Sequence, residues 1–255
     1  MKVQTVLDYI DSFAPFASAE PWDNSGLQVG SPDAEISSVL LCLDVTRSEV
    51  RQAAEKGVGL ILSHHPLIFH PLRSVSFDGV PAECVRQGIC VVSAHTNLDK
   101  APDGVNDSLC RALNMDFVKA PPSVAGGFLN TGTIPGVRSV RALASHVATR
   151  LHAPVRCVSS DRPVSSVAVC SGAGAEFASD AVSLGFDALI TGYASYHDFL
   201  EAEEAGLTLL AAGHFETEVV FMNDLQDKLR AAFPELRILL SARRAPLQTV
   251  LYHGD

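Results

Sequence analysis

The fold is decided by residues 38–66, which read SVLLCLDVTRSEVRQAAEKGVGLILSHHP. The run Ser38–Leu43 predicts a buried strand, Arg47–Lys56 predicts a helix, and Gly59–Leu62 predicts a second strand. A strand, a helix and a strand in this order are typical of an α/β domain. The segment therefore predicts an α/β fold, and the chain outside it continues the same alternation.

The remaining elements divide the chain into two α/β lobes. The Pro- and Gly-rich stretch Ala120–Gly127 predicts a linker or long loop, so we place the first lobe at residues 1–122 and the second at 123–218. The segment 219–255 is expected to join the first lobe, because its strands need a sheet. Expected elements are helices at Pro81–Gln87, Val140–Leu151, Ser195–Ala205 and Glu216–Ala232, and strands at Ile89–Ser93, Val155–Val158, Val167–Cys170, Ala188–Thr191, Ile238–Leu240 and Thr249–Leu251.

The composition favours a cytoplasmic globular protein. With 255 residues, 47% hydrophobic and 19% charged, the chain can bury a sizeable core. No apolar run approaches the roughly 20 residues that span a bilayer, and the N-terminus lacks the apolar core of a signal peptide. The six cysteines form no Cys-x-x-Cys pair and are typical of reduced core residues. A net charge of −10 offers no basic stripe and argues against nucleic-acid binding as the main role.

Imidazole side chains follow three of the expected strands. His64 and His65 follow the second strand of the opening segment, His95 follows Ile89–Ser93, and His214 follows a further expected strand at Leu207–Ala211. Adjacent side chains of a strand point to opposite sides, but the break at Pro66 lets His64 and His65 approach the same place. There they could bind one ion or two neighbouring ions. The ends of strands in α/β sheets are where such proteins build their sites.

Two of these clusters also contain a carboxylate. Asp99 lies four residues after His95, and Glu218 lies four residues after His214 on the same face of an expected helix. Imidazole plus carboxylate is a ligand set for zinc, manganese or iron, although the spacing matches neither a zinc finger nor a His-Glu-x-x-His helix. Asp99 and Glu218 are placed to bridge two ions, whereas Glu216 projects from another helical face.

Other motifs point less specifically to chemistry. The stretch Ser171–Ala175 has neither the third glycine of a dinucleotide fingerprint nor the Lys-Ser/Thr of a P-loop, so we expect a tight strand-to-helix turn. Ser63 has no nucleophile elbow around it. The segment Trp22–Gly30, with the only tryptophan, is expected to be an anchored loop.

Taken together, five motifs resemble the GTP cyclohydrolase 1 type 2 homolog family, also called NIF-three-like proteins. They occur in the family's order and span nearly the whole chain: Trp22-Asp23-Asn24-Ser25-Gly26-Leu27-Gln28-Val29-Gly30, Ser63-His64-His65-Pro66, His95-Thr96-Asn97-Leu98-Asp99, Thr191-Gly192 and Gly213-His214-Phe215-Glu216-Thr217-Glu218. The resemblance implies two intertwined α/β lobes with mixed sheets flanked by helices, a dinuclear metal centre in the cleft between them, and a ring-shaped homohexamer.

The resemblance also assigns roles to residues. It implies two divalent metal ions per chain, which could be zinc, iron, manganese, nickel or cobalt. The ligands carried over position by position are His64, His65, Asp99, His214 and Glu218. His95 and His197 match further family positions that face or support the site, and with Glu218 they are the candidates for moving protons.

This ligand set predicts a metal-dependent hydrolase that uses activated water. The resemblance to the family implies that the water attacks a nucleotide such as GTP. Two alternatives use the same ligands: a phosphoesterase acting on nucleotides, and a non-catalytic metal-binding or regulatory ring that serves as a platform for partners. The chain departs from the family at one position, since Tyr193 follows Thr191-Gly192 where an acidic residue is usual. That change removes a carboxylate expected near the site.

Overall fold

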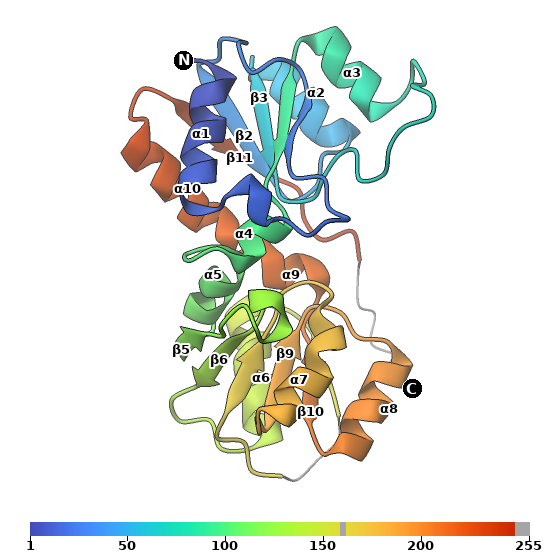
Figure 1. Ribbon diagram of the computed structural model, residues 1–255, viewed down its shortest axis with the longest axis vertical. Coiled ribbons are helices and arrows are strands. Elements are labelled where there is room, and N and C mark those ends of the chain that lie inside the picture. The colour runs from blue at the N-terminus through green and yellow to red at the C-terminus, as the bar shows by residue number, and fades with distance from the viewer. Residues whose placement is uncertain (159–161, 248–255) are drawn as a thin grey trace, which may run out of the picture. The chain divides into compact units, whose positions relative to one another are not determined.

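The computed structural model describes residues 1–158 and 162–247 and divides into two compact units (Figure 1). The first unit comprises Met1–Val105 with Phe221–Arg243, and the second comprises Asn106–Val220 with the described residues from Arg244 onward. Each unit is a mixed sheet flanked by helices, as the sequence predicts. Within the described ranges, no helix is both long and apolar enough to cross a membrane.

The sheet of the first unit places three strand ends at one edge. Its strands run in the order β1-β4-β3-β2-β11. The strands β11, β2, β3 and β4 are parallel, and β1 is antiparallel to β4. The register aligns Cys42 with Ser63 and Ser63 with Ser93, so β2, β3 and β4 end side by side. Their bounds are Gly26–Val29 (β1), Ser38–Cys42 (β2), Leu60–Ser63 (β3), Cys90–Ser93 (β4) and Arg237–Leu240 (β11).

Helices cover both faces of this sheet, which explains why its strands are almost entirely apolar. On one face, Leu40 and Ile61 pack in a buried cluster with Val50 of α2 and Cys84 of α3. Figure 1 shows α1 and α10 on the opposite side of the sheet, where the Tyr9 and Phe233 rings lie 5.2 Å apart. The helices are Val3–Phe13 (α1), Phe16–Ser18 (η1), Arg47–Glu55 (α2), Val80–Gln87 (α3), Thr96–Lys100 (α4) and Phe221–Ala232 (α10).

The second unit has a sheet of the order β5-β6-β8-β9-β10-β7. The strands β8, β9 and β10 are parallel, and the outer strands pair antiparallel. Their bounds are Asp116–Lys119 (β5), Asn130–Thr133 (β6), Arg156–Cys157 (β7), Val167–Val169 (β8), Ala188–Thr191 (β9) and Thr208–Ala211 (β10).

Alternate residues of these strands enter two separate cores. Ile190 and Leu210 pack in the cluster that contains Leu143 of α6. Leu189 and Leu209 pack in the cluster on the other face, against α7 and α8. The helices are Val105–Ala112 (α5), Ala125–Gly127 (η2), Val140–Leu151 (α6), Gly174–Phe177 (η3), Ala178–Ser183 (α7), Tyr196–Ala205 (α8) and His214–Glu218 (α9).

Several details differ from the sequence-based expectations. The described residues from Arg244 onward belong to the second unit, although the segment 219–255 was expected to join the first. The stretch Ala120–Gly127 connects β5 and β6, which are paired in one sheet, so it is a loop within the second unit; the division between units falls earlier, after Val105. The expected long helix Glu216–Ala232 is two helices, α9 and α10, separated where the chain passes from the second unit to the first. Cys157 is exposed while the other cysteines are buried. The expected strand Thr249–Leu251 lies outside the described residues.

Candidate metal centre

Polar side chains gather at the edge of the first sheet where β2, β3 and β4 end. Asp44 follows β2, His64 and His65 follow β3, and His95 follows β4. The main chain of the histidine pair stays attached to the neighbouring strand end, since His64 N–H donates to Cys42 O and His65 N–H donates to Leu43 O. Strand register therefore brings three imidazoles to one place, as the sequence predicts.

The three imidazoles form a compact cluster. One ligand atom from each of His64, His65 and His95 lies within 4.8 Å of the others, a group that could hold a metal ion. The ring centroids of His64 and His65 are 5.1 Å apart, so the adjacent histidines do approach one locus. His64 is fully buried, and the other two are partly exposed.

Each ring of this cluster has its Nδ1 atom fixed by an oxygen. Nδ1 of His64 lies 2.9 Å from Ala94 O, that of His65 lies 2.8 Å from Asp44 Oδ1, and that of His95 lies 2.8 Å from Asp23 Oδ1. A carbonyl or carboxylate oxygen only accepts, so Nδ1 carries the proton and Nε2 carries the lone pair, which is the atom through which such a ring can bind a metal or accept a proton. This arrangement is typical of metal-binding histidines.

Asp23 belongs to the Trp22–Gly30 segment, and its side chain is fully buried against His95. Besides the imidazole, it accepts hydrogen bonds from Thr96 N–H, Thr96 Oγ1 and Ser25 Oγ. Burial raises the pKa of Asp23, but the hydrogen bonds from His95, Thr96 and Ser25, together with the attraction to His95, outweigh this effect and hold the pKa well below its ordinary value. The carboxylate therefore stays ionised and orients the His95 ring.

The short helix α4 brings Asp99 to the cluster. His95 O accepts the N–H of Asp99, and the buried Asp99 carboxylate lies with Oδ1 3.5 Å from His64 Nε2. Two ligands each about 2.1 Å from one tetrahedral ion lie about 3.4 Å apart. The Asp99 and His64 atoms are thus spaced as two ligands of one metal ion would be.

The second unit holds another imidazole–carboxylate pair at the end of its parallel strands. His214 and Glu218 lie one turn apart on α9, with His214 Nε2 3.0 Å from Glu218 Oε2. The Glu218 side chain is buried, while that of His214 is 44% exposed. This separation also suits two ligands of one divalent ion, since ligands at right angles lie about 3.0 Å apart.

Two glycines make room for this pair. A Cβ added to Gly172, which has a φ of +60°, would overlap Glu218 Oε1. A Cβ on Gly192 would lie 2.5 Å from Thr217 Oγ1 and 2.8 Å from the His214 Cα atom. Gly172 and Gly192 follow β8 and β9, so the strand-to-helix turn predicted around Gly172 serves the close approach of a carboxylate. This role explains the Thr191-Gly192 motif.

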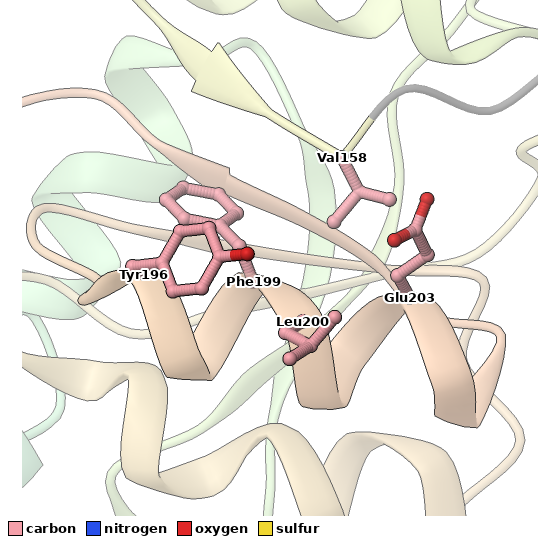
Figure 2. Close-up of a pocket in the computed structure, with 5 residues that line it drawn as sticks. All are labelled: Val158, Tyr196, Phe199, Leu200 and Glu203. Atoms are coloured by element: carbon pink, nitrogen blue, oxygen red, sulfur yellow. The ribbon is translucent and has the colours of Figure 1, made fainter.

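The other sequence-predicted residues lie elsewhere in the second unit. His197 is exposed on α8, with its ring 5.5 Å from that of Tyr196. Tyr193 is 53% exposed, and its N–H donates to Gly172 O. Figure 2 shows a pocket on α8 of about 140 Å³ whose lining offers one carboxylate among mostly apolar side chains: Val158, Tyr196, Phe199, Leu200 and Glu203. That lining lacks the imidazoles of a metal site.

The sequence did not reveal the roles of three residues of these clusters, Asp23, Asp44 and Gly172. Asp44 could have been found, because it follows the strand Ser38–Leu43 as the histidines follow theirs. Asp23 could not, because its partner His95 lies 72 residues away and the two meet only through the pairing of Gly26 with Ser93.

Comparison with known proteins decides the family. A sequence model of the Duf34/NIF3 (NGG1p interacting factor 3) family matches residues 1–246. The chain belongs to the Duf34/NIF3 family. Among its relatives, a GTP cyclohydrolase 1 type 2 homolog of Clostridium acetobutylicum is 30% identical over 249 residues, which cover 93% of each chain. The GTP cyclohydrolase 1 type 2 of Helicobacter pylori is 31% identical over 220 residues, 85% of this chain and 86% of that one.

The fold is also shared with a solved structure. The crystal structure of Staphylococcus aureus protein SA1388 has a TM-score of 0.90 at 23% identity, covering 98% of this chain and 99% of that chain. The resemblance recognised in the sequence is therefore confirmed for the family and the fold.

Proposed function

We propose that this Duf34/NIF3 protein is a metal-dependent hydrolase that acts on a nucleotide such as GTP. The proposed ligands of two divalent ions are His64, His65 and Asp99 of the first unit and His214 and Glu218 of the second. The observation that carries the proposal is the three-imidazole cluster, in which every Nδ1 is fixed by an oxygen and ligand atoms lie within 4.8 Å of one another. The name of the Helicobacter pylori relative suggests the substrate.

The donor set fits such ions, since neutral imidazole and carboxylate are their usual ligands. When bound, divalent ions would supply Lewis acidity and lower the pKa of water. The chain itself would orient the ligands: Asp44 and Ala94 O hold the rings of His65 and His64, so neither ring needs to reorganise on binding.

His95 is the proposed proton-moving group. Its Nδ1 donates to the ionised Asp23, so Nε2 can accept a proton from the attacking water and later return it to a leaving atom. Asp23 would stabilise the imidazolium form while Nε2 is protonated, as the acid of a catalytic triad does. Glu218 and the exposed His197 are the further candidates for proton transfer, and their roles remain predictions.

The test is mass-spectrometric analysis of GTP incubated with metal-reconstituted protein. A ring-opened product that is absent with Asp99→Asn and retained with His70→Ala would support the proposal; His70 is an exposed histidine five residues from His65. Released phosphate would favour the phosphoesterase. Intact GTP, with metal bound in the expected amount, would contradict the cyclohydrolase and favour the metal-binding platform.

We also propose that the chain assembles as a homohexamer, following the family resemblance. Sedimentation velocity of the full chain tests this assembly separately from activity. A monomer at micromolar concentration would contradict it.

A further inference from the structure

The Trp22–Gly30 segment carries an exposed aromatic side chain beside the histidine cluster. Trp22 is 59% exposed, and Phe69, from the loop after β3, is 38% exposed. Their ring centroids lie 5.9 Å apart, and they lie 6.3 Å and 6.1 Å from the His95 ring. Two apolar rings that reach solvent therefore flank the imidazole proposed to move protons.

Hydrogen bonds hold the main chain next to Phe69 against the Trp22–Gly30 segment. Asn24 Nδ2 donates to Ile68 O at 2.5 Å, and Ile68 N–H donates to Gln28 Oε1 at 2.7 Å. Gln28 Nε2 in turn donates to Asn24 O. Both polar main-chain groups of Ile68, the residue before Phe69, are thus bound by side chains of the Trp22–Gly30 segment.

The same segment fixes the imidazole. Asp23, next to Trp22, accepts hydrogen bonds from His95 and Thr96. Trp22, Phe69 and His95 are therefore linked through one short stretch of chain. A surface already ordered in this way loses little conformational entropy when a ligand binds.

The chemistry of the surface selects its ligand. Single exposed aromatic residues are common on protein surfaces. Two neighbouring aromatic rings beside imidazoles instead form an apolar surface next to polar groups, as in a ligand site. A planar heteroaromatic ring matches both, because its face stacks on an aromatic side chain while its ring nitrogens and carbonyls are polar. An aliphatic chain would leave the imidazole edge without a polar partner.

We propose that Trp22 and Phe69 form a stacking platform that binds the heteroaromatic ring of the substrate, with the ring edge toward His95. This inference rests on the proposed hydrolase function and names the part of the substrate that the first unit recognises. It also gives a purpose to the asparagine and glutamine of the Trp22–Gly30 segment, which hold the main chain beside Phe69.

The test uses the fluorescence of Trp22, the only tryptophan of the chain. The full-length protein, with and without added zinc, is titrated with GTP, ATP and UTP. Inorganic tripolyphosphate and ribose 5-phosphate serve as probes that lack the ring. We expect saturable quenching by at least one nucleotide and none by either ring-free probe.

A pair of variants links the quenching to the platform. Phe69→Ala should weaken binding of the quenching nucleotide at least about fivefold, since base–aromatic stacking contributes about 1–3 kcal/mol. The matched control is Phe77→Ala, which removes an 87% exposed phenylalanine from the same loop and should leave the affinity unchanged. Equal quenching by a ring-free probe, equal effects of the two variants, or no saturable quenching by any nucleotide would overturn the proposal.

This test and the product analysis can fail independently. Quenching that is lost in Phe69→Ala, together with intact GTP, would keep the platform and contradict the hydrolase. Product formation with an unchanged KM in Phe69→Ala would keep the hydrolase and contradict the platform.

Discussion

At the scale of single residues, each imidazole of the histidine cluster has an oxygen atom that accepts a hydrogen bond from its Nδ1. Ala94 O, Asp44 and Asp23 hold the Nδ1 atoms of His64, His65 and His95 in that order. The identity of these acceptors decides which ring nitrogen can bind a metal or accept a proton. The sequence alone predicts that the histidines meet, but it does not show which oxygen orients which ring.

Gly172 gives the first residue-scale prediction. We expect Gly172→Ala to lower the metal content of the protein, because a Cβ there would overlap the Glu218 carboxylate. The variant also has the strain of a side chain at a φ of +60°, about 1 kcal/mol. Metal content is measured by mass spectrometry of the dialysed protein.

The control for that strain is Gly185→Ala in the same unit. Gly185 has a φ of +77°, and a Cβ there would meet no heavy atom within 4 Å. Gly185→Ala should lose as much stability from backbone strain as Gly172→Ala, but it should keep its metal. Equal metal content in the two variants would contradict the proposed role of Glu218.

Asp187 gives a prediction about pH. Its carboxylate accepts hydrogen bonds from the N–H and hydroxyl groups of Ser165 and Ser166. Burial raises the pKa of Asp187, but these bonds outweigh it and lower the pKa below 3.8. The folded state thus favours the ionised form, so this stabilisation is present above the unfolded pKa and is lost as the pH falls through the folded value.

We therefore expect Asp187→Ala to lower the free energy of unfolding by about 1 kcal/mol at neutral pH. This value is at the low end of what hydrogen bonds to a charged group contribute, because Asp187 is partly exposed. The difference from the wild type should shrink below about pH 4. Urea unfolding at neutral pH and below about pH 4 measures this difference in the free energy of unfolding. A difference that stays constant with pH would show that the ionised carboxylate is not responsible.

At the scale of elements, the apolar strands and capped helices were predictable. The helix α6 has the expected bounds Val140–Leu151 with Ser139 accepting from Ala142 N–H, and β9 has the expected bounds Ala188–Thr191. The strand β1 was missed because Gly26–Val29 is too short to show a period, and its place is set by pairing with β4. Short elements that depend on tertiary pairing carry little local pattern.

The helix α8 gives the prediction at this scale. Ser195 accepts from Asp198 N–H and Asp198 accepts from Ser195 N–H, which is a capping box at the start of the helix that carries His197. We expect Ser195→Ala to lower the free energy of unfolding by about 1 kcal/mol. Ser145→Ala, an exposed position inside α6, should not destabilise the protein. Equal effects in thermal unfolding would mean that the cap contributes nothing.

At the scale of the whole molecule, each unit is a sheet with helices on both faces, and the first unit is assembled from two separate stretches of the chain, Met1–Val105 and Phe221–Arg243. The sequence predicts this return of the C-terminal segment because β11 needs a sheet, and β11 indeed pairs with β2. The Pro- and Gly-rich stretch Ala120–Gly127 led us to expect the boundary between the units too late in the chain. Such residues occur in loops that connect two strands of one sheet as well as at boundaries between units.

Metal removal is the prediction for the molecule as a whole. A metal ion that binds only the folded chain stabilises it by about 2.7 kcal/mol when its free concentration is 100 times Kd. We expect a chelator to lower the thermal midpoint by several degrees and added metal to restore it. In Asp99→Asn this shift should be much smaller. An equal shift in wild type and variant would mean that the stabilising ion binds elsewhere.

The amount of metal bound per chain shows most directly whether the histidine cluster is part of a metal centre. Wild type, His65→Ala and His70→Ala are reconstituted with zinc, dialysed and measured by mass spectrometry, with circular dichroism to verify folding. If the cluster belongs to a dinuclear centre, wild type and His70→Ala bind two ions per chain and folded His65→Ala binds fewer. Undiminished metal in His65→Ala, or a wild type that retains none, would contradict this assignment of the cluster.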